Sequence, residues 1–109
     1  MALALNVFQT VTAVVPANPT IFYTAPVGYT GVVLLAQVTN IGATSEDITF
    51  VHRRSSTDTE LLKEYPISAN DTSSLLAGKL VLESGDKLVL SGSNASNLKF
   101  VASLLETLN

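Results

Sequence analysis

The residues that could do chemistry in this chain gather around its one histidine. His52 is followed within a few positions by Ser55 and Asp58, the three residue types of a hydrolytic triad. A nucleophile, a base and an orienting carboxylate must converge in one pocket, whereas residues of a single strand and its polar tip point to alternating faces or into solvent. We therefore predict no catalytic residues and no enzymatic activity.

His52 also heads the main basic cluster, with Arg53 and Arg54 directly after it. Such a small cluster at the end of a strand is typical of a solvated surface, where ion pairs contribute little. Its functional interpretation is a salt contact with an acidic neighbouring subunit. On that interpretation Arg53 and Arg54 are candidate interface residues.

Acidic and aromatic residues offer two further candidate sites. Four aspartates stand in or beside predicted turns, without the alternating spacing of a calcium loop: Asp47, Asp58, Asp71 and Asp86. We predict no metal and no cofactor. Tyr23 and Tyr29, which flank the Pro26–Gly28 turn, are candidate glycan contacts, although aromatic residues near such a turn more often plug the end of a sandwich.

Composition excludes several classes of protein. The 109 residues carry a net charge of −3 with only six basic residues, too few for a face that neutralises nucleic-acid phosphates. The longest apolar run, Val32–Ala36, is far shorter than the roughly 20 residues that span a bilayer. We expect a soluble protein without membrane insertion. A hydrophobic content of 47% against 14% charged residues is high for a small domain, so part of the apolar surface should meet a partner.

The elements that position these residues are short strands separated by turn signals. Alternation of apolar and polar residues with period two predicts strands rather than helices. The predicted strands cover residues 2–15, 20–24, 31–40, 47–54, 60–66, 79–82, 87–90 and 98–105. This pattern is typical of an all-β protein, and we predict one antiparallel β-sandwich over residues 1–109, immunoglobulin-like or jelly-roll-like.

The turns predict how these strands connect. Glu83–Asp86 predicts a β-hairpin between 79–82 and 87–90, and the polar segment 69–74 predicts a crossing from one sheet to the other. Segment 47–54 is expected to pair with 31–40. The residues predicted to supply much of the core are Val32, Leu34, Phe50, Leu80, Leu82, Leu88, Leu90, Phe100 and Ala102.

The first fifteen residues carry more apolar surface than one edge strand of a small sandwich needs. With no lysine and no proline before Pro16, they form an edge that can pair with another chain. We predict contacts between copies, closing into a trimer or similar ring. The alternative is that this segment packs on its own sandwich. The candidate interface residues, apart from the two arginines, are Leu3, Leu5, Val7, Phe8, Val33, Leu35 and Leu105.

Four motifs in their order along the chain carry a resemblance to a known family. They are Phe22–Gly28, an apolar strand ending in Asn40, Ile67–Thr72, and the run Gly78–Leu90. In this order they resemble small virion structural proteins of tailed bacteriophages, above all those of cyanophages and other marine phages. The resemblance covers residues 20–105 and consists of turns and hydrophobic alternation.

This resemblance implies a β-sandwich building block of a virus particle, and it transfers no catalytic residue. The expected function is that of a capsid decoration or cement subunit, or another accessory particle subunit. The alternative is a neck, tail, baseplate or fibre component that binds carbohydrate. The expected partners are further copies of the chain and a larger phage shell or tail protein. The expected location is the virion, assembled in the cytoplasm of the bacterial host.

Overall fold

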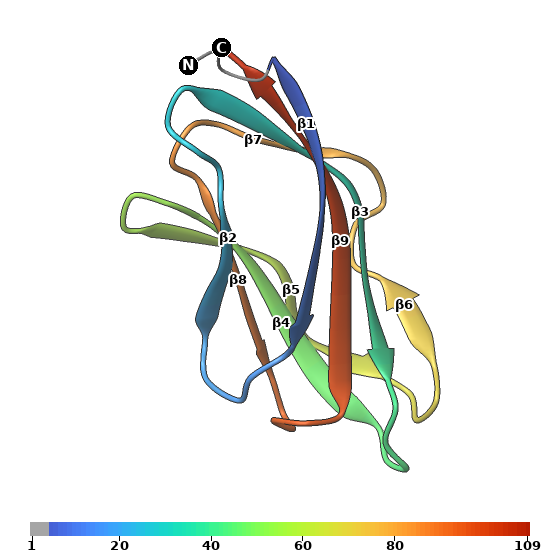
Figure 1. Ribbon diagram of the computed structural model, residues 1–109. Helices are drawn as coiled ribbons and strands as arrows, with labels where there is room; N and C mark the ends of the chain where they lie inside the picture. Colours follow the sequence, from blue (N-terminus) through green and yellow to red (C-terminus); the bar gives the residue numbers. More distant parts are fainter. Residues whose placement is uncertain (1–4) are drawn as a thin grey trace.

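The computed structural model describes residues 5–109, which form nine β-strands in two antiparallel sheets packed against each other (Figure 1). The five-stranded sheet has the order β1, β9, β3, β6, with β7 also paired to β3. Its strands are β1 (Asn6–Val14), β3 (Tyr29–Asn40), β6 (Thr72–Ser74), β7 (Leu80–Leu82) and β9 (Leu98–Leu108). The four-stranded sheet, in the order β2, β8, β4, β5, contains β2 (Thr20–Thr24), β4 (Glu46–Arg54), β5 (Thr57–Ile67) and β8 (Lys87–Gly92). The prediction of an antiparallel β-sandwich is confirmed.

Strand β9 shows how alternation in the sequence becomes a two-faced strand. Leu98, Phe100, Ala102 and Leu104 are buried between the sheets, and the residues between them face the other way. Successive side chains of a strand point to opposite faces, so the apolar set enters the core as one block. The predicted period of two is confirmed here.

The core joins the two sheets through three phenylalanines. Phe22 of β2 and Phe50 of β4 belong to one sheet, and Phe100 of β9 belongs to the other. The Phe22 and Phe100 rings meet edge to face at 4.5 Å, and both lie 6.2 Å from the Phe50 ring. Edge-to-face contacts of this kind add stability beyond the area that they bury.

The predicted hairpin over residues 79–90 is wrong. Strand β7 pairs with β3 in the five-stranded sheet, whereas β8 pairs with β2 and β4 in the other. The turn signal is real, since Gly85 has a φ of 87° and the Asp86 N–H bonds to the Glu83 carbonyl at 2.9 Å. The Gly85 N–H donates to the carbonyl of Ala25, and the turn leads the chain from one sheet to the other.

The expected pairing of 47–54 with 31–40 is also wrong. Strands β3 and β4 lie in different sheets, and β4 pairs with β5 and β8. The assignment of 60–66 as a strand is confirmed, because these residues belong to β5. The segment before Thr72 crosses from β5 to β6 and so changes sheet, as predicted.

A bulge in β3 changes which residues of this strand are buried in the core. The pairing with β9 shifts between Val33 and Leu35, so one extra residue breaks the strict alternation. Val33 is therefore fully buried, while Val32 is only partly buried and Leu34 is exposed. Val32 and Leu34 were predicted in the core and Val33 at an interface, and these three assignments are wrong.

The rest of the predicted core lies inside the sandwich. Leu80 is partly buried and packs against the core. The fully or almost fully buried members are Phe50, Leu82, Leu88, Leu90, Phe100 and Ala102.

Candidate assembly interface

An apolar row crosses the outer face of the five-stranded sheet. Phe8 of β1 stands opposite Leu105 of β9, Leu105 opposite Val32 of β3, and Val32 opposite Val81 of β7. Residues directly opposite each other in antiparallel strands have their side chains on the same face. Phe8 is 74% exposed and Val81 is 56% exposed, with the other two partly buried between them. We call these four residues the outer apolar row.

The bulge of β3 extends this apolar surface. Leu35 stands opposite Ser103 of β9, next to the pair of Val32 with Leu105. Both Leu34 and Leu35 are exposed, because the extra residue at the bulge turns neither side chain into the core. Contiguous apolar surface of this kind on a small protein marks a contact with another molecule.

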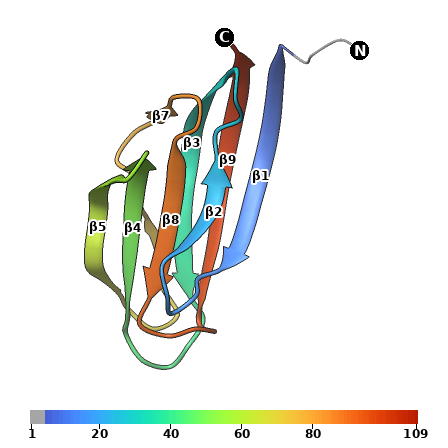
Figure 2. The ribbon, with the colours of Figure 1, turned by 90° about the vertical axis from the view of Figure 1, so that its left-hand side faces the viewer.

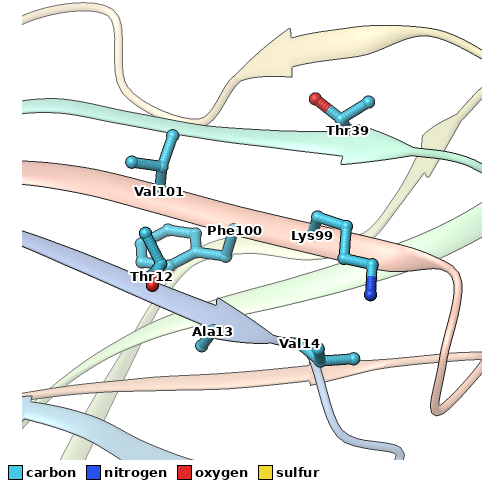
Figure 3. A pocket seen from close by; sticks show the side chains of 7 residues that line it. All are labelled: Thr12, Ala13, Val14, Thr39, Lys99, Phe100 and Val101. Carbon is cyan, nitrogen blue, oxygen red and sulfur yellow. The ribbon is translucent and has the colours of Figure 1, made fainter.

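A hollow of about 570 Å³ lies on the same sheet, towards the end of β1 (Figure 3). Lys99 is the one charged residue among the side chains that line it (Figure 3). The lining residues are Thr12, Ala13, Val14, Thr39, Lys99, Phe100 and Val101. The hollow therefore offers mostly apolar and hydroxyl contacts, beside the edge strand.

Strand β1 is the edge of the five-stranded sheet and carries no charge. Its nine residues, Asn6–Val14, contain no Lys, Arg, Asp, Glu or Pro. The edge strand β5 differs, because its eleven residues include Asp58, Glu60, Lys63, Glu64 and Pro66. Charges and proline on an edge prevent pairing with other chains, so β5 is protected and β1 is not.

A buried carboxylate fixes β1 and β2 to β9. Glu106 is 5% exposed; its Oε2 accepts a hydrogen bond from the Tyr23 hydroxyl at 2.5 Å, and its Oε1 accepts one from Gln9 Nε2 at 2.7 Å. Burial, followed by the bond to Glu106, raises the pKa of Tyr23 above its ordinary value. Tyr23 is thus a core residue, and its prediction as a glycan contact is wrong. Tyr29 is partly exposed at the start of β3.

Asp86 gathers the groups that the sequence suggested for chemistry. Its side chain is 2% exposed. The carboxylate accepts two hydrogen bonds from Arg54, at 2.7 and 2.8 Å, and one from the Glu83 N–H at 2.9 Å. It also lies 3.0 Å from His52 Nε2. The Arg54 guanidinium, helped by His52 and the Glu83 N–H, holds the pKa of the Asp86 carboxyl well below its usual range although burial opposes this. This cluster fixes the 83–86 turn to the end of β4.

The triad suggested by the sequence is not assembled. His52 contacts Asp86 rather than Ser55 or Asp58, and Asp58 makes a two-bond ion pair with Arg53 at 2.6 and 3.1 Å. Both candidate interface arginines are therefore already paired within the chain. Within residues 5–109, no three His, Cys, Asp or Glu side chains are grouped closely enough to hold a metal ion, and no helix has the length and apolar character to cross a membrane.

The predicted interface residues differ in their exposure, and only some of them lie on the outer surface of the sandwich. Leu3 lies outside the described residues. Leu5 and Leu35 are exposed, and Phe8 and Leu105 belong to the outer apolar row. Val7 is partly buried and pairs with Glu106, on the inner side of the sheet. Val33 is wholly buried, so it is unavailable to a partner and its prediction as an interface residue is wrong.

Sequence reasoning missed Val81 in the outer apolar row and Glu106 in the core. Val81 was hidden by the assumption of a hairpin, because only pairing with β3 places it beside Val32. Glu106 could have been found. Continuing the alternation of Phe100, Ala102 and Leu104 by one step puts it on the buried face, and a buried carboxylate needs donors nearby.

No protein-family model and no curated protein sequence matches this chain. Solved structures do match. One is a chain of the acid-stable capsid structure of Helicobacter pylori bacteriophage KHP30, which is 12% identical, with a TM-score of 0.57 over 96% of this chain and 89% of that chain. Another comes from Bacillus endospore appendages, described as a family of disulfide-linked pili; it is 12% identical, with a TM-score of 0.56 over 100% and 97% of the two chains. At this identity the likeness is one of fold.

Proposed function

We propose that this chain is a structural subunit of a bacteriophage virion, acting through repeated protein–protein contacts as a capsid decoration or cement subunit and not as an enzyme. The observation that carries the proposal is the outer apolar row beside the uncharged edge of β1. A lone soluble domain gains nothing from apolar residues aligned across one face, whereas a subunit buries them against its neighbours.

Two independent likenesses support the phage assignment. The order of motifs over residues 20–105 resembles small virion proteins of tailed phages, including cyanophages, and the fold is similar to that of a chain in a phage capsid structure. The second structural neighbour is a pilus subunit chain, which is again part of a repetitive assembly. The proposed location is the virion, assembled in the host cytoplasm.

The proposed partners are further copies of this chain and a larger phage shell or tail protein. The outer apolar row spans four strands, and its members Leu105, Val32 and Val81 suit the larger protein, because a broad sheet face can lie flat on a shell. A specific contact of this kind buries on the order of 1,000 Å² or more.

The test is incorporation into particles. Val81→Glu adds a charge to the outer apolar row and is expected to reduce the copies found in purified particles at least tenfold, since an unpaired charge would be buried in the contact. Val27→Glu is the matched control, because Val27 is 90% exposed and lies outside the row. Equal incorporation of both variants, or no chain in purified particles, would contradict the proposal.

Copy number in purified particles decides the position of the subunit. Hundreds of copies per particle are expected for a shell subunit. A few copies at one vertex would instead indicate the neck, tail, baseplate or fibre.

A further inference from the structure

We propose that two copies of this chain join through antiparallel pairing of their β1 strands about a two-fold axis at Thr10, with Phe8 of each copy seated in the hollow of the other. This deepens the proposed function by naming the occupant of the β1 edge, and it rests on that function only for the premise that copies meet. Each five-stranded sheet would continue into that of its partner.

The hydrogen bonds at both ends of β1 show which backbone groups are free for such pairing. The Leu5 carbonyl accepts from the Leu108 N–H at 2.8 Å, and the Val15 N–H donates to the Leu98 carbonyl at 2.9 Å. In an antiparallel ladder, residues bond alternately to one side and to the other. The register of β1 with β9 has no shift, so the odd-numbered residues bond to β9. The even-numbered residues, Asn6 to Val14, direct their N–H and C=O groups to the free edge.

A two-fold axis at Thr10 uses all of these groups. It places Thr10 opposite its own copy, Phe8 opposite Thr12, and Asn6 opposite Val14. Every such pair joins two even-numbered residues, so each is a hydrogen-bonded pair. No other two-fold register overlaps the full length of Asn6–Val14. The pairing brings no charge against a like charge, because β1 has none.

The same register puts an exposed ring beside a hollow. Phe8 is 74% exposed, and its partner residue Thr12 lines the hollow of about 570 Å³ together with Val14 and Val101. Val14 is a diagonal neighbour in the paired ladder, and Val101 stands opposite Thr12 on β9. Aromatic side chains reach both direct and diagonal neighbours. Two-fold symmetry repeats the fit, so both rings and both hollows are filled.

The other sheet edges are less suited to this role. Strands β6 and β7 have three residues each, β2 has five and a shift in register, and β5 carries charges and a proline. Figure 2 shows β1 at one border of the molecule, with the other strands all on the same side of it. A partner strand can therefore approach β1 without displacing any other strand of residues 5–109. One such contact closes as a dimer, unlike the ring that the sequence suggested.

Cysteine cross-linking tests the register directly, because the chain has no cysteine of its own. In a hydrogen-bonded pair the two Cα atoms of Thr10 lie about 5.5 Å apart, within the range of a disulfide. Thr10→Cys is therefore expected to form a covalent dimer under mild oxidation. Thr12→Cys is the matched control, since the two copies of Thr12 would lie more than about 14 Å apart, far beyond the range of a disulfide. Cross-linking of neither variant, or of both equally, would overturn the proposal.

Sedimentation of the protein without introduced cysteines gives an independent measurement of dimerisation. Thr10→Lys sets two like charges opposite each other and is expected to weaken dimerisation about tenfold. Thr59→Lys, which alters an exposed threonine of the β5 edge by the same charge, should leave it unchanged. A wild-type protein that stays monomeric up to millimolar concentration, or equal effects of the two lysines, would refute the pairing.

These measurements separate the two proposals. Particles that contain the chain, together with no cross-link at Thr10, would leave the proposed function standing and remove the pairing. A cross-linked dimer in solution, together with particles that lack the chain, would do the opposite.

Discussion

Replacing Phe8 by serine separates the role of this residue in assembly from any role in folding. Phe8 is 74% exposed in the single chain, so few of its contacts are lost within the fold. Exposed substitutions usually change the free energy of unfolding by no more than about 0.5 kcal/mol. We therefore expect the thermal and denaturant midpoints of Phe8→Ser to stay close to those of the wild type at concentrations where both are monomeric.

The effect on association follows from the exposed area. A phenylalanine offers about 200 Å² of surface, so the exposed part of Phe8 is about 150 Å². At about 25 cal/mol per Å², burial of that area contributes about 3 to 4 kcal/mol for each ring, or about 7 to 8 kcal/mol for the two Phe8 rings of a two-fold dimer, as an upper value. The dissociation constant of the dimer should thus rise by up to about 10⁵-fold, at about tenfold for each 1.4 kcal/mol.

Analytical ultracentrifugation over a concentration series, combined with chemical denaturation, measures both quantities. Phe50→Ala is the opposite control, because Phe50 is fully buried and its loss should lower the free energy of unfolding by about 3 to 5 kcal/mol. Val27→Ser should change neither quantity. If Phe8→Ser destabilised the fold by more than about 1 kcal/mol and left association intact, Phe8 would be packing on its own sandwich and would have no role in the contact between copies.

Three further predictions concern the interior. Phe100→Ala should lower the free energy of unfolding by about 3 to 5 kcal/mol, and a double-mutant cycle with Phe22→Leu should give a coupling of about 0.5 to 1.5 kcal/mol; additive effects would contradict the ring contact. The pKa of Asp86 is lowered in the fold. The contribution of its carboxylate to folding stability is therefore complete above its pKa in the unfolded chain, near 4, and is lost as pH falls below that value. The difference in melting temperature between wild type and Asp86→Asn should thus shrink below about pH 4, whereas Asp58→Asn should show little difference at any pH. The pKa of Tyr23 is raised in the fold, so the contribution of its neutral hydroxyl to stability is complete below about pH 10 and is lost above it. The melting temperature of Tyr23→Phe should therefore depend less on pH in the alkaline range than that of the wild type. Parallel curves of melting temperature against pH would count against the buried bond to Glu106.

The limits of sequence reasoning are clearest at β3. Its sequence, Tyr29–Asn40, is apolar at adjacent positions, so two opposite alternations are both compatible with it. The bulge between Val33 and Leu35 uses one of them before the shift and the other after it. A one-residue slip moves a side chain to the other face, and neighbouring strands decide where the slip occurs. That is why Val33 proved to be buried and Leu34 exposed.

For the charged residues, too, the sequence predicts the group but not its partners. The sequence suggested His52, Arg53 and Arg54 as a group, and all three do lie at one end of β4. Their partners could not be predicted, because Asp86 is more than thirty positions away along the chain and reaches Arg54 only through the turn between the two sheets. Once paired, the same residues are structural supports of that turn.

Local patterning is enough to show that this protein is built from strands and which residues are apolar on each strand, because the period of two is a local property of the backbone. It also showed that residues 6–14 carry no charge and no proline, because this can be seen without any neighbour, whereas their place at the edge of the sheet depends on strand pairing. The separation of β7 and β8 into different sheets cannot be seen in the local pattern, and it is this separation that makes Val81 complete a row with Val32, Leu105 and Phe8. Strand pairing joins residues far apart along the chain, and its register depends on the packing of the whole sandwich.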